Sequence, residues 1–318
     1  MEVGAGCVVC GSPPPYRDLF TRAGYRLVRC PQCGLVFQDP QPSDADLQRT
    51  YYHDPAFTAA LFGSYRELTL EQARQKLDLL ESLVGSLAPG RALDVGCSSG
   101  AWLEVSADRG WHATGIEPGA ETARAARERG LDVRSGTLEQ VAPQLDERGF
   151  DLISFWDVLE HVRDPRRELA VAARLLAPGG VLALTMPNEA GWYPRVTYRV
   201  LARRTGVWEY PELPAHLYDF NPATISRLLR SSGYRPLGIR TWPVPYSYYR
   251  STSLSGPALG PRARGLGLRL AFGALRLGVY PVARLFGRSN YMAVAAVGAT
   301  PPPCSAVAVA SEPPERLG

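Results

Sequence analysis

The sequence predicts a doubly wound α/β fold, and the clearest sign is one glycine-punctuated loop. The strand-like run ALDV ends in the turn GCSSG, which leads directly into the helix-like stretch AWLEVSADRG. Gly96 and Gly100 permit backbone angles that a side chain disfavours, and the start of the next helix presents free N–H groups. A strand, a glycine turn and a helix in this order are typical of a pocket for a nucleotide-like ligand.

The strands that follow support the same fold. WHATGIE is strand-like and ends in Glu117, 23 residues after Asp94. A carboxylate at this point of a dinucleotide-type fold accepts the hydroxyl protons of a ribose. Two more strands are expected at 149–155 and 179–186, each after a helix-like stretch. Strands that alternate with helices predict a mostly parallel sheet with helices on both faces.

Further elements are expected on either side of this unit. Residues 66–85 have the pattern of a charged amphipathic helix, which we expect to pack on the sheet. Asn221 and Pro222 introduce another helix. Strands are then expected at 234–242 and, antiparallel to its neighbours, at 289–298, with an insertion between them at 243–288.

Four of the six cysteines form two paired motifs. Cys7 and Cys10 are separated by two residues, Cys30 and Cys33 likewise, and 19 residues lie between the pairs. Two such turns direct four thiolates at one tetrahedral metal, which is the spacing of a zinc ribbon. Four cysteine ligands leave no open position for water, so we expect a structural zinc. Disulfides, the alternative, require an oxidising compartment.

Length and composition suit one catalytic domain with additions, since 318 residues exceed the usual single domain and 45% are hydrophobic. No long uncharged apolar stretch or signal peptide is present, so a cytoplasmic location is expected. The expected division is a zinc ribbon at 1–42, a helical linker at 43–90, a catalytic domain at 91–298 and a disordered, proline-rich tail at 299–318.

Four segments carry a resemblance to a known family: ALDVGCSSG, GIEPG, FDLISFWDVLEHVRDP and LLAPGGVLALTMPN. In order and spacing they resemble class I S-adenosylmethionine-dependent methyltransferases, most closely the type 11/23 group, which includes quinone, sugar and natural-product methylases. The resemblance spans residues 91–240 and implies a Rossmann-like sheet of seven strands. One departure is Ser98, where the family usually has glycine.

The resemblance also implies a binding site for S-adenosylmethionine around the first loop. Glu117 would bind the ribose hydroxyls, and the glycines would let the cofactor approach the backbone closely. The residues expected to bind the cofactor are Asp94, Gly96, Cys97, Ser98, Gly100, Glu117, Pro118, Thr137 and Trp156.

Two histidines are candidates for the base that a hydroxyl acceptor needs. Asp157, Glu160 and His161 follow the strand at 149–155, at the edge of the sheet where such folds bind ligands. If a helix has begun there, Asp157 and His161 share one face, and the acid could orient the imidazole. His216 is the second candidate, as base or substrate contact. For either histidine the alternative is a structural hydrogen bond.

The acceptor is expected to be a small molecule. The Asn/Asp-Pro-Pro-aromatic signature of nucleobase amino methylases is absent, and the group resembled implies an oxygen of a sugar, glycan precursor or secondary metabolite. Aromatic rings crowd 191–220 and could stack on a sugar or planar ring, or form the core of a lid. They are Trp192, Tyr193, Tyr198, Trp208, Tyr210, Tyr218 and Phe220.

From Phe220 to Ser311 the chain has eleven arginines and no acidic residue. Four arginines (262, 269, 276 and 284) recur on one side of any helix across 262–288, with an apolar side opposite. This pattern fits peripheral contact with an anionic membrane or a diphosphate-bearing substrate. It fits a helical lid or dimer surface as well, so the oligomeric state stays open.

Other functions were weighed against methyl transfer. GCSSG satisfies the G-x-S-x-G elbow of α/β-hydrolases, but residues 1–90 lack the strands and oxyanion loop that this fold needs. The dinucleotide motif G-x-G-x-x-G fails at two of its glycines. An RNA methyltransferase that uses the ribbon and the basic C-terminal region remains an alternative. A non-catalytic zinc-dependent scaffold is another.

Overall fold

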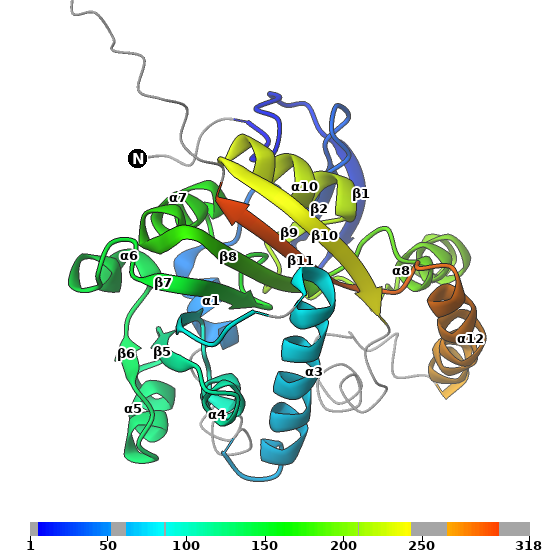
Figure 1. Cartoon of the computed structure of the whole chain (residues 1–318). Helices are drawn as coiled ribbons and strands as arrows, with labels where there is room; N and C mark the ends of the chain where they lie inside the picture. The colour runs from blue at the N-terminus through cyan, green and yellow to red at the C-terminus, as the bar shows by residue number, and fades with distance from the viewer. Residues whose placement is uncertain (1–5, 52–61, 86, 209, 243–265, 299–318) are drawn as a thin grey trace, which may run out of the picture.

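The computed structural model describes residues 6–51, 62–85, 87–208, 210–242 and 266–298 (Figure 1). The expected tail at 299–318 and part of the insertion, 243–265, lie outside the described residues.

A seven-stranded sheet forms the centre of the molecule, in the order β10-β11-β8-β7-β4-β5-β6. Five strands are parallel, and β11 runs antiparallel between β8 and β10. The doubly wound, mostly parallel sheet predicted from the sequence is therefore confirmed. The strands are β4 (Arg91–Val95), β5 (His112–Glu117), β6 (Val133–Ser135), β7 (Phe150–Trp156), β8 (Leu176–Pro187), β10 (Tyr234–Trp242) and β11 (Tyr291–Gly298).

Helices cover both faces of this sheet, as Figure 1 shows. On one side lie α3 (Arg66–Val84), α4 (Ala101–Asp108) and α5 (Ala120–Glu128), whose apolar residues share one core cluster. On the other side lie α6 (Leu138–Val141), α7 (Pro165–Leu175) and α10 (Pro222–Ser231). The short 3-10 helix η1 (Ala142–Gln144) follows α6. The expected packing of α3 on the sheet is confirmed, since α3 contacts β10 and β11.

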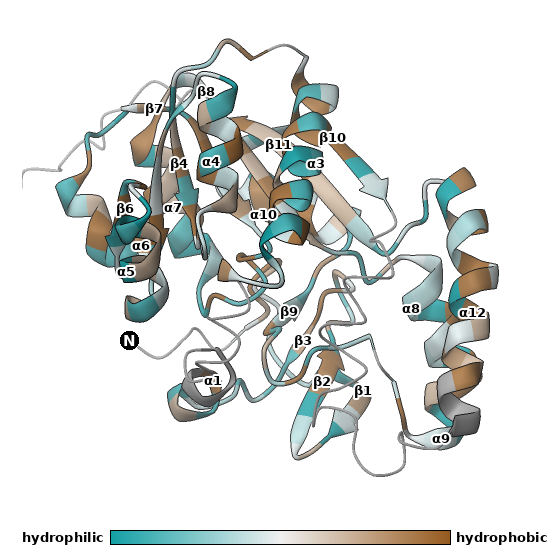
Figure 2. Ribbon diagram, turned by 90° about the horizontal axis from the view of Figure 1, so that it is seen from below, coloured by the Kyte–Doolittle hydropathy of each residue, from teal (hydrophilic) through white to brown (hydrophobic). Residues whose placement is uncertain are grey.

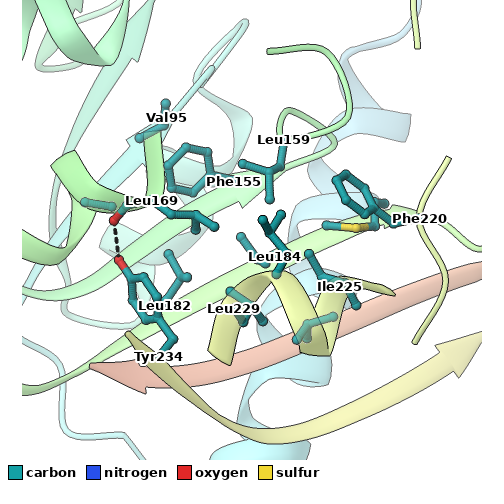
Figure 3. Packing of buried hydrophobic residues seen from close by; sticks show 14 of the residues in the cluster. Val95, Phe155, Leu159, Leu169, Leu182, Leu184, Phe220, Ile225, Leu229 and Tyr234 are labelled. Atoms are coloured by element: carbon teal, nitrogen blue, oxygen red, sulfur yellow. Dashed lines mark hydrogen bonds between the residues drawn. The ribbon is translucent and has the colours of Figure 1, made fainter. Parts of the chain in front are cut away.

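The larger core lies between the sheet and the layer of α7 and α10 (Figure 3). Phe155 and Leu184 point from the strands toward Ile225 and Leu229 of α10. Burial of each such side chain stabilises the folded state by about 1.5–3 kcal/mol relative to leaving it exposed to water. The hydroxyl of Tyr234 in this cluster is satisfied, because it donates to the carbonyl of Leu169 at 2.8 Å. The core thus positions the carboxyl ends of the strands, where loops gather.

The N-terminal cysteine module forms a second sheet, of β1 (Arg17–Arg22), β2 (Tyr25–Arg29) and β3 (Val36–Gln38). Its fourth strand is β9 (Tyr218–Asp219), which comes from far along the chain. Helix α1 (Asp44–Tyr51) follows the module. Phe37 and two of the cysteines belong to the same core cluster as α7 and α10. The module is therefore packed into the rest of the protein through a continuous core.

A helical lobe stands at the margin of the molecule. It contains α8 (Trp192–Thr197), the π-helix η2 (Tyr198–Ala202), α9 (Arg203–Thr205) and α12 (Leu266–Leu285), which packs on α8. Within the predicted insertion, α12 departs from expectation at one residue. Arg276 is only 4% exposed and donates through Nε to the hydroxyl of Tyr193 at 3.0 Å. It therefore does not lie on an outer arginine face but packs inside the lobe against Tyr193, whose ring centroid is 5.7 Å from its guanidinium carbon.

The aromatic rings of 191–220 serve mainly as a core for this lobe. Trp208 is buried and packs against Phe20 of β1, Tyr198 and Tyr210, with ring centroids 4.9–5.6 Å apart. Tyr193 packs on Tyr280 of α12. These rings therefore have packing roles, in a core that the lobe shares with Phe20, Leu27 and Val36 of the cysteine module. Whether they also contact an acceptor, or act as a lid, stays a prediction.

Candidate functional site

The first loop has the backbone conformation that its glycines suggested. Gly96 and Gly100 have φ of 73° and 77°. Added Cβ atoms would lie 2.6 Å from Val158 Cγ2 and 2.3 Å from Leu131 Cδ1, respectively. Side chains therefore cannot fit at either glycine without displacing its neighbour. Ser98 has φ of 51°, a left-handed conformation that costs a residue with a Cβ roughly 1–2 kcal/mol.

Glu117 lies opposite this loop at the carboxyl end of β5. Its Oε2 accepts from the backbone N–H of Ser98 at 3.0 Å, and its Oε1 accepts from that of Gly119 at 2.7 Å. A carboxylate offers about four acceptor positions, so lone pairs remain for two ribose hydroxyls. The loop glycines and the fixed carboxylate together fit an adenosylmethionine site, since they combine close backbone approach with a diol acceptor.

The other residues expected at the cofactor surround this loop in different ways. Asp94 is buried, accepts from the Ser154 hydroxyl at 2.7 Å, and burial raises its pKa to about 7. Cys97 is buried under the loop, and burial raises the pKa of its thiol well above the usual range. Thr137 caps α6 by accepting from Gln140 N. Pro118 follows Glu117 directly. Their contacts with a cofactor stay predictions.

Trp156 ends β7 and has an unused donor. Its ring is nearly buried, and Nε1 has no hydrogen-bond partner among the described residues. Lys76 Nζ lies 5.9 Å from the ring centroid. A buried N–H without a partner is costly, which favours a site completed by a ligand.

Asp157 does not stand one helical turn before His161, and that part of the prediction is wrong. Residues 157–161 form a turn in which Asp157 has φ of 62°, and α7 begins only at Pro165. Asp157 accepts instead from Lys76 Nζ and from the Thr185 hydroxyl, each at 2.9 Å. The helix starts late because Asp164 is its N-cap and accepts from Arg166 N and Arg167 N.

The two histidines, predicted as alternatives, lie in one cluster. The ring centroids of His161 and His216 are 4.7 Å apart. His161 Nδ1 lies 3.1 Å from the carbonyl oxygen of Ala215 and, because a carbonyl only accepts, Nδ1 carries the proton of the neutral ring. Burial lowers the pKa of both histidines to about 4, so both are neutral at physiological pH.

Carboxylates flank this pair on two sides. Glu212 Oε2 lies 3.6 Å from His216 Nε2, and Glu212 remains partly exposed. Glu160 is 1% exposed, and within the described chain neither carboxylate oxygen has a hydrogen-bond partner. Burial, then the charge of Asp157, raise the pKa of Glu160 well above its usual range. Three possible ligand atoms lie within 4.8 Å of one another, one from each of Glu160, His161 and His216. This trio could hold a proton or a cation.

The four cysteines of the N-terminal module meet at a second cluster. Cys7 Sγ lies 3.5 Å from Cys33 Sγ, and Cys10 Sγ lies 3.6 Å from Cys30 Sγ. These distances exclude disulfides, whose sulfurs are about 2.05 Å apart. They suit four thiolates around one zinc, for which Zn–S bonds of about 2.3 Å place sulfurs roughly 3.8 Å apart. The cluster therefore fits the predicted metal.

Comparison with known proteins decides the family. A family model described as a methyltransferase domain matches residues 62–237, more than half of the chain. The chain belongs to this methyltransferase family. The match and the sheet order agree with the methyltransferase resemblance that the four motifs carry. The hydrolase and dinucleotide alternatives do not agree with this assignment.

Individual relatives resemble parts of this methyltransferase. The ubiquinone biosynthesis O-methyltransferase of Marinobacter nauticus is 38% identical over 111 residues, which cover 33% of this chain and 47% of the relative. Its counterpart in Bordetella avium is 28% identical over 173 residues, which cover 52% of this chain and 70% of the relative. The methyltransferase thus spans about half the length of the first relative.

A solved structure of a SAM-dependent methyltransferase from Archaeoglobus fulgidus resembles this one with a TM-score of 0.50. It is 16% identical, and the likeness covers 76% of this chain and 99% of that chain. At this identity the likeness shows the fold alone.

Some residues of the site were not found by sequence reasoning. Lys76 is the one lysine of the chain and stands on α3, far in sequence from the Asp157 that it pairs with. The other 34 of the 35 Lys and Arg residues are arginine, so the single lysine was a signal in the sequence, although it lies in none of the motifs. Thr185 lies in the quoted segment LLAPGGVLALTMPN but was not singled out there, and Glu212 lies in none of the quoted segments. Only the packing of distant segments places these two residues at the site.

Proposed function

We propose that this methyltransferase transfers a methyl group to an oxygen of a small molecule whose hydroxyl is carried by a ring. Two relatives are named as O-methyltransferases, which supports oxygen as the acceptor atom. The buried pair of neutral histidines is the single observation that favours this chemistry most, because a hydroxyl must lose a proton as it is methylated. Phenolic hydroxyls are favoured by the relatives' names, and sugar hydroxyls remain the second candidate.

The residues of the first loop would hold S-adenosylmethionine. Glu117 would accept the ribose hydroxyls, and the backbone at Gly96 and Gly100 would lie against the cofactor. When bound, the cofactor supplies a methyl group that its sulfonium already activates. The protein must then mainly hold the acceptor oxygen in line with the S–CH3 bond, and such positioning accounts for much of the rate.

Proton removal is the task of the histidine pair. With S-adenosylmethionine bound as methyl donor, His161 Nε2 or His216 would take the proton that the acceptor hydroxyl loses as its oxygen is methylated. The imidazolium so formed would lie near Asp157 and Glu212, whose negative charge would stabilise it. Lys76 of α3 and Thr185 of β8 each donate to one oxygen of Asp157 and hold this carboxylate in place.

Turnover on two probes tests this proposal. Purified protein is incubated with S-adenosylmethionine and either 3,4-dihydroxybenzoate or UDP-glucose, and the methylated product is identified by mass spectrometry and NMR. A methyl ether on either probe supports oxygen transfer and selects the acceptor class. A methyl group on carbon would contradict it. Assays with and without EDTA and added Mg²⁺ show whether the Glu160 trio uses a cation.

We propose a structural zinc at the four cysteines. All four ligand positions are sulfur, and three strands with a few apolar residues cannot make a stable core unaided.

The outer face of α12 supports peripheral contact with an anionic membrane. Leu277 and Leu285 are each 82% exposed, and Leu270 and Phe286 are also largely exposed. Figure 2 shows α12 at the margin of the molecule, with hydrophobic residues along it. Exposed Arg284 and Arg288 would bind lipid headgroups. The structure has no helix with the length and hydrophobicity to span a bilayer among its described residues. Co-sedimentation with anionic vesicles, lost in Leu277→Asp, tests this contact.

A further inference from the structure

The segment that carries His216 belongs structurally to the cysteine module. Strand β9 begins two residues after His216 and pairs antiparallel with β3, in the register Phe37 with Tyr218. The backbone N–H of Gln38 continues this pairing by donating to the carbonyl of Leu217 at 2.9 Å. The last strand of the module is thus drawn from the segment that also supplies a candidate base.

The side chain of Gln38 makes the most direct link between the two. It is 1% exposed, and its Nε2 donates to the carbonyls of Pro214 at 2.8 Å and His216 at 2.6 Å. The carbonyl between these two, that of Ala215, accepts from His161 Nδ1. Three consecutive carbonyls are therefore held, two by the module and one by the other histidine. A shift of this segment would move both rings together.

The module also holds the beginning of the same loop. Arg22, at the end of β1, donates to the carbonyl of Trp208 at 3.0 Å and to that of Pro211 at 2.6 Å. Within the loop, His216 N donates to the carbonyl of Glu212 at 2.8 Å. Side chains of the module thus contact the loop backbone at both of its ends. Separation of β3 from β9 would leave backbone N–H groups without partners in a buried region, which is costly.

We propose that Gln38 is a positioning residue for the histidine pair, so that the cysteine module forms part of the acceptor site. The expected effect of Gln38 on turnover rests on the proposed function of His161 and His216 as bases. That Gln38 positions the two rings does not depend on that function. A primary amide is suited to hold two carbonyl groups, because it has two N–H donors in a fixed plane. Leucine has a similar volume but no donor, and asparagine has both donors on a shorter arm.

The experiment uses the full chain loaded with zinc and compares Gln38→Leu with Arg26→Leu. Arg26 is the matched control because its side-chain hydrogen bonds within the described chain all go to Asp18 and Asp39 near the module, and none reaches the loop. The ring nitrogens of His161 and His216 are followed by NMR and assigned with His161→Asn and His216→Asn. Turnover is measured on whichever of 3,4-dihydroxybenzoate and UDP-glucose is methylated, and cofactor affinity by calorimetry.

In Gln38→Leu we expect both histidine signals to shift, and the pKa of His216 to rise from about 4 toward its ordinary value as water reaches the ring. The groups that face this ring are His161, Asp157 and Glu212, and none of them is altered by the variant. We expect kcat on the probe to fall about tenfold to hundredfold, because the base is displaced. Cofactor affinity should stay within about twofold, since Gln38 has no contact with the first loop. Arg26→Leu should leave all three readouts unchanged.

Unchanged histidine signals in Gln38→Leu would overturn the proposal, as would equal effects of the two leucine variants. If Gln38→Leu does not fold, Gln38→Asn is read in the same way, and there too unchanged signals refute the positioning role. If neither probe is methylated, the proposed acceptor class fails, while the NMR signals still decide the role of Gln38.

Discussion

The imidazole rings of His161 and His216 face each other with centroids 4.7 Å apart, in a tilt of 60°. One ring follows β7 and the other precedes β9, so the contact joins the central sheet to the sheet of the cysteine module. His216 is buried, His161 is half-buried, and both are neutral, so either can accept a proton, and each ring limits the movement of the other.

Replacing either histidine should slow turnover without loosening the cofactor. We expect His161→Asn or His216→Asn to lower kcat on the methylated probe by about a hundredfold to ten-thousandfold, the range of general-base catalysis. The double variant should lose much less than the product of the single losses, because the residues act as one cluster. Steady-state kinetics and calorimetry measure both quantities. Wild-type turnover in all three variants would show that no histidine base operates.

Glu117→Ala should weaken binding of S-adenosylmethionine. The carboxylate is held by Ser98 N and Gly119 N and would make charge-assisted hydrogen bonds to the ribose. Their loss should cost roughly 1.5–3 kcal/mol of binding free energy, measured by titration calorimetry. Glu121→Ala is the control, since Glu121 pairs with Arg124 on the surface of α5 and should leave affinity unchanged. Equal affinity of Glu117→Ala and wild type would remove Glu117 from the site.

Ser98→Gly should stabilise the fold. Ser98 has φ of 51°, which a Cβ disfavours by roughly 1–2 kcal/mol, whereas added backbone freedom in the unfolded chain costs about 0.5–1 kcal/mol. The net gain should be about 0.5–1 kcal/mol in urea unfolding. Ser99→Gly is the matched control because Ser99 has no positive φ, and it should lose stability instead. A loss in both variants would mean that Ser98 makes a compensating contact.

Purified protein should contain one zinc per chain, held by Cys7, Cys10, Cys30 and Cys33. Cys7→Ser should release it and lower the thermal midpoint by on the order of 5 °C, because the module shares a core with α7 and α10. Metal analysis and calorimetry check these values. A native protein without zinc and with four titratable thiols in the module would contradict the assignment.

The histidine pair should destabilise the protein in mild acid. Burial holds both pKa values near 4, below the ordinary 6.5, so the unfolded chain binds more protons as pH falls. Above about pH 6.5 both rings are neutral in the folded and the unfolded chain, and the free energy of unfolding is unaffected by them. Between pH 6.5 and 4 each ring lowers this free energy by roughly 1–3 kcal/mol, because only the unfolded chain binds the proton. Urea unfolding at pH 7 and 5 should show a smaller acid loss in the double asparagine variant.

Raised carboxyl pKa values, such as that of about 8 for Asp219, act in the opposite direction. Asp219 is unaltered in the double variant, so the difference between the two proteins reports mainly on the histidines. An equal acid loss in both proteins would show that the rings are not held neutral.

The sequence by itself determined the central sheet and the first loop, because local signals suffice there. Alternating strands and helices led to the parallel sheet, and the expected strand at 234–242 matches β10. Asn221 was expected to introduce a helix, and it caps α10 with its side chain. The glycines predicted the turn because no other residue tolerates its angles in so little space. The spacing of the four cysteines in two pairs likewise predicted that their sulfurs meet in one cluster.

Tertiary structure alone decided the arrangement of the candidate site. Lys76 meets Asp157, His161 meets His216, and Gln38 holds the segment at 214–216, although none of these partners is near the other in sequence. Arg276 turned inward for the same reason, because a hydroxyl of α8 was close enough to pair with it. Periodicity records which face of an element is apolar, whereas the partner of a polar side chain depends on which distant segments the core brings together. The candidate acceptor site is therefore built from contacts that no local pattern encodes.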